Sequence, residues 1–352
     1  MTPTEIQEVN EHLRAVAAIL FRNTPEEKRQ DFESIERTLR EQILTQVGPT
    51  IGKFFFEAAT GTTAGRVRQV ISCLGKVEIT ERQAEKLELK KNSRLSPLLE
   101  KCCLRLVANE SFENAEKDIE IMTGMKVSHS SQQRLVQRYE FAETEAKKTV
   151  DTLSIDGGKV RLRTDLGEPS EWRDYKAIML HGQVCAGFFQ ANQELIDWTN
   201  SQPLAEVITC LGDGHDGIWN IIAKIGNSES KREVLDWYHL KENLYKIGGS
   251  NARLKQVENY LWSGKVELAL AKFEGLEGKE VKNFSAYLNK HRQRIPNYKL
   301  SQELGICIGS GGVESTIKRI GLRMKISGAQ WKAENVPQYL KLRCAYLNQE
   351  IA

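Results

Sequence analysis

The stretch TCLGDGHDGIWNI, residues 209–221, joins one apolar run to another through glycine, aspartate and histidine. The first run has the length of a short buried strand, and the second has helical spacing. Asp213 is therefore expected at the end of the strand, and Asp216 at the N-cap of the helix. In α/β sheets, chemistry gathers at strand ends. A tight turn that uses two aspartates explains the same residues, so this stretch alone leaves both interpretations open.

A second aspartate occurs in a comparable setting upstream. In SIDGGKVRLRT, residues 154–164, an apolar run reaches Asp156, and we predict a turn at Gly157-Gly158 followed by a second β arm. If the strands that lead to Asp156 and Asp213 are neighbours, their carboxylates lie at one edge of the sheet. The glycine after each aspartate leaves room for a phosphate or a metal to approach the backbone. A few carboxylates, with further positions left to water and phosphate, form the ligand set that Mg²⁺ prefers.

A third carboxylate heads a basic segment farther along the chain. In IGSGGVESTIKRIGLRMK, residues 308–325, a glycine-rich approach leads into a predicted helix with Glu314 in its first turn. The segment 315–345 has one acidic residue, Glu334, and seven basic ones: Lys318, Arg319, Arg323, Lys325, Lys332, Lys341 and Arg343. A solvated helix face is the ordinary explanation of such a run. In a chain whose formal net charge is only +3, the imbalance favours a surface for a polyanion.

The composition narrows the class of protein. The chain has 352 residues, enough for two or three domains, and its 40% hydrophobic and 28% charged residues predict a soluble globular protein. Seven cysteines show neither paired metal spacing nor a small disulfide framework. No run of roughly 18 apolar residues predicts a membrane span, and the start lacks the layout of a secretory signal. We therefore expect a cytoplasmic protein with no membrane partner.

The first part of the chain has a helical pattern. Residues 4–48 place apolar side chains at every third or fourth position, which predicts two amphipathic helices. The second of these is expected over residues 25–47, with Pro25 in its first turn. A connection of small residues follows at 52–65.

A β-hairpin and further helices are predicted next. The β-prone arms of residues 67–82 flank Gly75-Lys76, which predicts a hairpin, and helices are expected over residues 96–148. Beyond residue 149, short strands alternate with helices, which predicts a mixed α/β sheet. These changes divide the chain into a helical N-terminal region (1–66), a region with the β-hairpin and a helix-turn-helix (67–148), and an α/β region (149–352).

The helix-turn-helix is predicted within residues 111–140. Ser111 is suited to cap a first helix, Gly124 breaks it, and a second helix opens after Val127-Ser128. The second helix of such a motif enters the major groove of DNA. Its candidate DNA-contacting residues are Gln132, Gln133, Arg134 and Arg138. An ordinary helical hairpin has the same sequence pattern, so both interpretations stay open.

Four strings in order carry a resemblance to a known family: SIDGGKVRLRT, CLGDGHDGIWNI, DWYHLKENL and GSGGVESTIKRIGLRMKISGAQWK. With SFENAEKDIEIMTGMKVSHSS, they resemble bacterial insertion-sequence transposases of the ISKra group over roughly residues 65–347. These are DDE enzymes with an RNase H-like catalytic core, and Mutator-like relatives place an all-helical insertion before the glutamate. The resemblance implies that insertion at about residues 240–300. His239 matches a histidine of those relatives, and a packed structural histidine explains it equally well.

The resemblance also implies a site and an activity. Asp156, Asp213 and Glu314 would be the catalytic residues and the ligands of two Mg²⁺ or Mn²⁺ ions. The protein would bind the terminal repeats of its element and perform metal-dependent DNA cleavage and strand transfer, as a homodimer or larger assembly on double-stranded DNA. It would act in the bacterial cytoplasm, associated with the nucleoid. The residues expected to hold the DNA backbone are Lys318, Arg319, Arg323 and Lys325.

The sequence departs from the family in one respect, and two other functions stay open. Relatives often carry a cysteine-containing, zinc-binding segment after the hairpin, but here only Cys102-Cys103 is present, so we predict no structural zinc. A DNA-binding regulator that no longer cleaves is one alternative. The other is a hydrolase of small phosphoesters that uses Asp213, His215 and His239, which leaves the basic segment unexplained.

Overall fold

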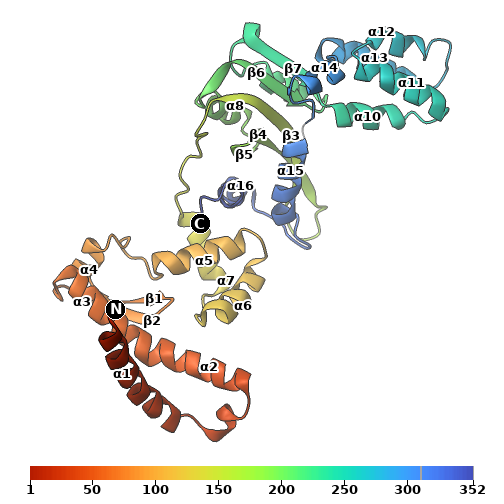
Figure 1. The fold of residues 1–352 in the computed structure, drawn as a ribbon. Helices are drawn as coiled ribbons and strands as arrows, with labels where there is room; N and C mark the ends of the chain where they lie inside the picture. The colour runs from red at the N-terminus through yellow and green to blue at the C-terminus, as the bar shows by residue number, and fades with distance from the viewer. Residues whose placement is uncertain (310, 352) are drawn as a thin grey trace. The chain divides into compact units, whose positions relative to one another are not determined.

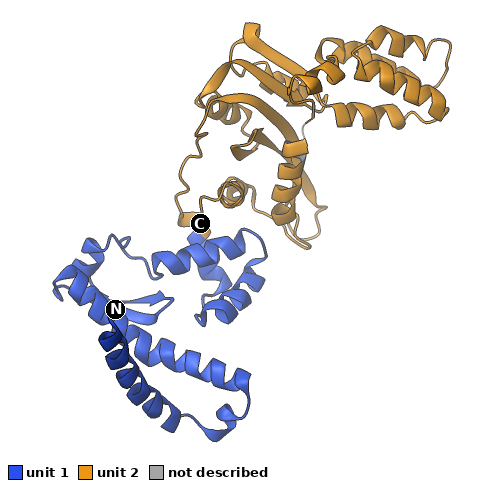
Figure 2. Cartoon of the chain, viewed as in Figure 1, with its two compact units in different colours: residues 1–135 blue, residues 136–352 orange. Residues whose placement is uncertain are grey.

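The computed structural model describes residues 1–309 and 311–351, apart from the side chains of Val313 and Glu314. The chain forms two compact units, Met1–Leu135 and Val136–Ala352, coloured separately in Figure 2. The boundary between them lies within helix α7 (His129–Arg138). Of the helices in the described part of the chain, none is both long enough and apolar enough to span a membrane.

Unit 1 begins with helices, as the sequence predicts. Thr2 and Glu5 form a capping box at the start of the first helix, in which each side chain accepts a hydrogen bond from the backbone of the other residue. The segment predicted as one helix from Pro25 instead begins with a single 3₁₀ turn, and an α-helix starts only after the N-cap Asp31. The elements of this part are α1 (Pro3–Arg22), η1 (Glu26–Arg29), α2 (Phe32–Gln42), the π-helical turn η2 (Ile43–Val47) and α3 (Gly48–Thr60).

The predicted connection at residues 52–65 is mostly helix α3. Gly48 is required at its start because a Cβ there would overlap the Leu74 carbonyl of the following hairpin. That hairpin is confirmed as β1 (Val67–Ser72) and β2 (Gly75–Thr80), antiparallel to each other. Its turn, Cys73-Leu74, lies two residues earlier than predicted, and Gly75, with a left-handed φ of 104°, packs against the Leu44 carbonyl as the first residue of β2. A small core under the hairpin contains Val70, Val77, Ile79 and Ala84.

The remaining helices of unit 1 include the predicted helix-turn-helix segment. Ser111 caps α6 as expected, and Gly124 ends that helix with a left-handed φ of 72°. Two helices joined by a short turn are therefore present, although a DNA-binding motif requires more than this arrangement. The bounds are α4 (Glu81–Lys86), α5 (Pro97–Val107), α6 (Phe112–Thr123) and α7 (His129–Arg138).

Helix does not continue to Lys148, contrary to our prediction. Residues 139–149 have no regular structure because their backbone bonds to other parts of unit 2. The Trp198 indole donates to the Thr144 carbonyl at 3.1 Å, and the Ala146 amide donates to the Gln202 side chain at 2.8 Å. Tertiary hydrogen bonds thus replace the helical ones over this segment.

Unit 2 is built on a five-stranded mixed sheet, which confirms the predicted mixed α/β class (Figure 1). The strand order is β5-β4-β3-β6-β7. The central strand β3 is antiparallel to β4 and parallel to β6; β4 and β5 are antiparallel, and β6 and β7 are parallel. The bounds are β3 (Val150–Leu162), β4 (Glu171–Leu180), β5 (Val184–Phe189), β6 (Leu204–Gly212) and β7 (Lys231–Leu235).

The predicted turn at Gly157-Gly158 is wrong, since β3 runs straight through both glycines and pairs with β4 over its whole second half. A Cβ at Gly158 would come within 2.6 Å of the Tyr175 ring, and Tyr175 is fully buried. Gly158 admits an aromatic side chain from β4, and the hairpin turns only after Leu162, which pairs with Glu171.

Helices cover both faces of this sheet. Leu153 and Ile155 of β3 pack in the main core with the helices α8 (Asn192–Asn200) and α9 (Asp216–Ile222). On the other face, Thr316 of α15 (Gly311–Met324) contacts Met179 of β4, and Leu340 of α16 (Val336–Leu347) lies over Gly187 of β5. Asp156, which alternates with Ile155, belongs to this second face.

Between β7 and α15 the regular structure is helical, in line with the all-helical insertion expected at about residues 240–300. A cluster of aromatic rings, Trp237, Trp262 and Tyr298, packs its first, second and last helices together, and the Tyr298 hydroxyl donates to the Leu235 carbonyl at 2.8 Å. The helices are α10 (Trp237–Tyr245), α11 (Asn251–Trp262), α12 (Val266–Ala271), α13 (Lys279–His291) and α14 (Tyr298–Glu303). Single 3₁₀ turns complete the unit: η3 (Ser228–Ser230), η4 (Arg292–Arg294) and η5 (Ala333–Asn335).

Candidate active site

Asp156 and Asp213 lie on the neighbouring parallel strands β3 and β6. The strands pair Ser154 with Leu211, so each aspartate stands two positions beyond that pair, at the carboxyl end of their shared ladder. Both side chains are half-buried. The structure therefore brings together the two carboxylates that the sequence predicted at one sheet edge.

The two carboxylates also interact electrostatically. Burial raises the pKa of Asp156, and the nearby Asp213 carboxylate raises it further. A hydrogen bond from the Gly157 amide at 2.6 Å and the positive charges of His239 and Lys176 act in the opposite direction. Two acids that disfavour each other's charge in a half-buried place are suited to bind a cation that would stabilise both.

The loop after Asp213 is held by the helical segment. The Asp213 carboxylate accepts a hydrogen bond from the His215 amide at 2.9 Å, and the Asp213 carbonyl accepts one from the Tyr287 hydroxyl of α13 at 3.3 Å. Gly214 has a left-handed φ of 97°, and a Cβ there would lie 2.6 Å from the Tyr287 oxygen. Burial raises the pKa of Tyr287 to about 12, so this hydroxyl keeps its proton as a donor. The α10–α14 segment thus fixes the position of Asp213.

Asp216 does not cap α9, contrary to our prediction. The N-cap is His215, whose ring accepts a hydrogen bond from the Gly217 amide at 3.0 Å. Asp216 occupies the first helical position, where a carboxylate is favoured by the helix dipole, and pairs with Lys290 of α13 at 2.6 Å. It is exposed and directed toward that lysine. Asp216 therefore helps to hold α13 against this loop, and it is not part of the candidate site.

A third aspartate, which sequence reasoning missed, ends the next parallel strand. Asp236 follows β7, is 1% exposed, and caps α10 by accepting a hydrogen bond from the His239 amide at 2.7 Å. Its carboxylate also lies 3.2 Å from Nδ1 of His239. The signal was present in VLDWYHL, where an aspartate separates the apolar end of a predicted strand from a helix in the same way as Asp213.

His239 is a positive charge at the site. The contact with Asp236 raises the pKa of His239 to about 9 against the opposing effect of burial, and the carboxylates of Asp156 and Asp213 act in the same direction as Asp236. The imidazolium thus offsets part of the charge of three aspartates, namely Asp156 just beyond the β3–β6 ladder, Asp213 after β6 and Asp236 after β7. Both earlier interpretations of His239 combine here, since the ring is packed and also faces the predicted catalytic carboxylates.

Glu314 lies in the first turn of α15, while its side chain falls outside the described part of the structure. The chain enters this helix beside the site, because the Trp237 amide donates to the Ile308 carbonyl at 3.0 Å and Gly309 packs against the Tyr238 ring and Asp236. Among the side chains that are described, no group of three His, Cys, Asp or Glu is arranged to hold a metal ion. The described donors are the two aspartates, and the predicted third ligand is Glu314.

The predicted DNA-contacting residues of α7 divide into two groups. Gln133, Arg134 and Arg138 are exposed. Gln132 is fully buried, and its amide donates to the Val127 carbonyl at 2.9 Å, so its assignment as a DNA contact is wrong. It faces inward because it shares a helix face with the buried Leu135.

A similar correction applies on α15. Lys318, Arg319 and Lys325 are exposed, as a DNA-binding surface requires. Arg323 is 2% exposed, and its guanidinium lies 4.9 Å from the Trp331 ring centre and 5.8 Å from that of Tyr339. Arg323 is therefore a structural residue that joins α15 to the segment before α16 and to α16 itself.

No protein-family model matches the chain, and no curated protein matches it either. Function is therefore inferred from the residues of the site and their arrangement.

Proposed function

We propose that this protein is a DDE transposase of the insertion-sequence type, with an RNase H-like catalytic core interrupted by a helical insertion. The observation that carries the proposal is the pair Asp156 and Asp213 at matching positions of two parallel strands, close enough to disfavour each other's charge. The mixed sheet of order β5-β4-β3-β6-β7, in which β4 alone runs opposite to the other four strands, supports the RNase H-like fold. The helices between β7 and α15 correspond to the expected insertion.

The donor set fits a pair of divalent ions such as Mg²⁺ or Mn²⁺. Asp156 and Asp213 would hold them, with Glu314 from the first turn of α15 as the third ligand. Such ions supply an activated oxygen nucleophile and charge stabilisation for the leaving oxygen of a phosphodiester. The residues of the chain then have distinct tasks. Tyr287 holds the Asp213 loop, and the imidazolium of His239 moderates the negative charge and so favours the approach of a phosphate.

Exposed basic residues supply a surface for double-stranded DNA. Lys318 and Arg319 follow Glu314 on α15 and Lys325 comes directly after the helix, which would place the phosphate backbone beside the carboxylates. Gln133, Arg134 and Arg138 of α7 would contribute to recognition of the terminal repeats. Both contacts suit an enzyme that acts on the bacterial chromosome in the cytoplasm.

The test is metal-dependent nicking and strand transfer on duplex DNA that carries the inverted repeats of the element. The variants are Asp156→Asn, Asp213→Asn and Glu314→Gln, and Asp216→Asn is the matched control, since that carboxylate pairs with Lys290. We expect the three site variants to bind DNA with unchanged affinity and to cleave about 10³-fold more slowly, as the loss of several kcal/mol of charge stabilisation implies. The control should cleave at the wild-type rate.

Two other outcomes would overturn this proposal. If the wild-type protein binds the repeats but shows no cleavage with either ion, it is a DNA-binding regulator derived from such an enzyme. If it hydrolyses a small phosphomonoester and binds DNA no better than a neutral protein does, the small-molecule hydrolase is the correct function.

A further inference from the structure

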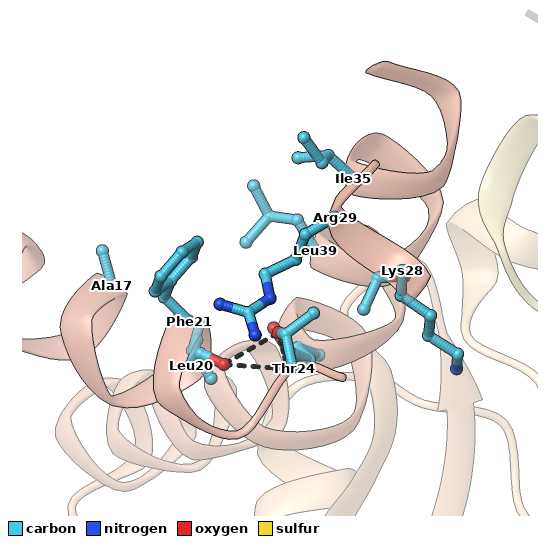
Figure 3. A pocket seen from close by; sticks show the side chains of 10 residues that line it. Ala17, Leu20, Phe21, Thr24, Lys28, Arg29, Ile35 and Leu39 are labelled. Atoms are coloured by element: carbon cyan, nitrogen blue, oxygen red, sulfur yellow. Dashed lines mark hydrogen bonds between the residues drawn. The ribbon is translucent and has the colours of Figure 1, made fainter. Parts of the chain in front are cut away.

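The pocket between α1 and α2 in unit 1 has mainly apolar walls (Figure 3). The Thr24 hydroxyl and the Gln42 amide both donate to the Leu20 carbonyl, at 2.9 and 3.2 Å. The Arg29 guanidinium lies 4.6 Å from the centre of the Phe21 ring. These contacts join α1 to the segments that follow it, so the pocket is explained as part of the fold. A thiol of unit 2 has surroundings that folding alone does not require.

That thiol is Cys307, in the segment that leads into α15. The described part of this segment, residues 304–309, follows α14 and precedes the helix whose first turn contains Glu314. All seven cysteines are free, and Cys307 is one of three that are partly exposed, together with Cys73 and Cys102. The candidate active site does not use this thiol. A free and accessible thiol beside an imidazole is a candidate for chemistry of its own.

The imidazole of His181 lies against the Cys307 thiol. Sγ of Cys307 is 3.7 Å from Nδ1 of His181, a hydrogen-bond distance for sulfur. His181 follows β4, and its amide donates to the Thr152 carbonyl of β3 at 3.0 Å. Burial lowers the pKa of His181, and the Asp151 carboxylate opposes this change. The ring is therefore neutral at neutral pH and has a lone pair that can accept a proton.

Ser154 orients this ring from its other nitrogen. Its hydroxyl makes a hydrogen bond with Nε2 of His181, and the serine is fully buried in β3. When Nε2 carries the ring proton and donates it to the hydroxyl, Nδ1 presents its lone pair to Cys307. A nucleophile, a base within reach and a third group that orients the base form the arrangement that activates nucleophiles in enzymes. Cys307, His181 and Ser154 are here called the Cys307 triad.

The surroundings of the thiol favour a small, polar electrophile. Sγ of Cys307 also lies 3.2 Å from the Gly309 carbonyl, and the neighbouring Ile308 is 9% exposed. A part-buried sulfur between an imidazole and a carbonyl admits a small molecule that can form hydrogen bonds more readily than a bulky one. Hydrogen peroxide has these properties, and it oxidises cysteine to sulfenic acid.

We propose that the Cys307 triad is an oxidation site, at which a hydroperoxide converts the Cys307 thiol to a sulfenic acid. The sulfur attacks one peroxide oxygen and the O–O bond breaks, so the sulfur loses two electrons and the peroxide gains them. His181 takes the thiol proton at Nδ1 and passes it to the departing hydroxide, which leaves as water. This oxidation site does not rest on the proposed transposase activity.

Oxidation would act on the entry to α15. The Ile308 carbonyl accepts a hydrogen bond from the Trp237 amide at 3.0 Å, and a Cβ on Gly309 would overlap the Tyr238 ring. An oxygen added to Sγ needs space between this closely packed segment and His181, so it displaces the residues that lead to Glu314. This consequence, unlike the oxidation itself, rests on the proposed function, since it predicts slower DNA nicking by the oxidised protein.

The first test labels sulfenic acid with dimedone after brief treatment of the full chain with hydrogen peroxide. Peptide mass spectrometry then gives the rate of labelling at each cysteine. Cys307 should be labelled at least about tenfold faster than the partly exposed Cys73 and Cys102, because a positioned general base contributes at least that much.

Variants of the triad test the roles of its members. His181→Gln and Ser154→Ala should each lower the labelling rate of Cys307, the first by at least about tenfold and the second by less, since the base is still present. His129→Gln is the matched control, because it changes an exposed histidine of unit 1 and should leave the rate unchanged. Urea unfolding verifies that each variant is folded, and Ser154→Ala keeps the test decisive if His181→Gln does not fold.

Two results would overturn the oxidation site. One is labelling of Cys307 that is no faster than that of Cys73 and Cys102. The other is a folded His181→Gln or Ser154→Ala protein that is labelled at the wild-type rate.

The consequence for DNA is measured separately, after the peroxide has been removed. Treated wild type should nick DNA more slowly than untreated wild type, whereas Cys307→Ser should nick at one rate with and without treatment. If labelled wild type nicks at the untreated rate, the effect on α15 is wrong and the oxidation site stands. If untreated wild type does not nick DNA at all, the proposed function is wrong, and the labelling rates decide the oxidation site by themselves.

Discussion

Gly158 shows how a single missing side chain shapes the surroundings of Asp156. The ring of Tyr175 occupies the space where a Cβ would stand, since that Cβ would lie 2.3 Å from the ring carbon Cζ and 2.4 Å from the phenol oxygen. Gly157 next to it is exposed, and a Cβ there would meet only the flexible end of Lys176, at 3.0 Å. The two glycines are adjacent in sequence but differ in what the fold requires of them.

This difference gives the first prediction. Gly158→Ala should destabilise unit 2 by about 1–3 kcal/mol, the usual cost of overpacking a filled core, whereas Gly157→Ala should change stability by less than about 0.5 kcal/mol. All six tryptophans lie within residues 172–331, so urea unfolding followed by tryptophan fluorescence reports on this unit alone. Equal stabilities of the two variants would show that Tyr175 does not constrain β3 as described.

His239 makes the stability of unit 2 depend on pH. Its pKa is raised to about 9 from an ordinary value near 6.5, so the protonated ring stabilises the folded state. That contribution is complete below about pH 6.5 and is lost as the pH rises through about 9. With EDTA present, the free energy of unfolding of the wild type should fall by about 1–2 kcal/mol more than that of His239→Gln over this pH range, after allowance for a side chain that is 28% exposed. Urea unfolding of both proteins at pH 6 and pH 9.5 measures this difference, and parallel pH profiles for the two proteins would refute the prediction.

Some site residues could be predicted from sequence, and others required packing. Asp156 and Asp213 were identifiable because each follows an apolar run in the sequence and precedes a glycine, whatever packs around them. The reason why residue 158 is a glycine could not be predicted, because it depends on Tyr175, a residue of another strand. Gln132 and Arg323 were misassigned by residue type alone, although helical spacing places Gln132 with Leu135, and Arg323 with the buried Ile320. That spacing was the available signal.

At the scale of elements, α15 joins the candidate site to the proposed surface for DNA. Its first turn contains Glu314, one side packs against β3 and β4 through residues such as Thr316, and Lys318 and Arg319 are exposed on it, with Lys325 directly after its end. Arg323 holds this helix in place by stacking over Trp331 and Tyr339. The basic residues of this segment thus divide into one that stabilises the fold and three that are proposed to bind DNA.

The division is testable with two substitutions. Arg323→Ala should destabilise unit 2 by about 2–3 kcal/mol, because it removes a buried cation that contacts two neighbouring aromatic rings. Lys325→Ala should leave stability unchanged within about 0.5 kcal/mol and reduce the slope of log affinity against log salt by about 1, because one phosphate contact is lost. Unfolding curves and DNA-binding isotherms at several salt concentrations separate these effects. A Lys325→Ala protein with the wild-type salt slope would remove this residue from the DNA surface.

At the scale of the whole molecule, the proposed cleavage and strand transfer make different demands on the chain. Cleavage needs only the candidate site of unit 2 and one DNA end, while joining two ends needs two active sites held together. Helix α1 belongs to unit 1, and none of its side chains is part of the candidate site. Substitutions on the exposed side chains of α1 should therefore leave the rate of nicking at a single DNA end unchanged, because the carboxylates of unit 2 are untouched.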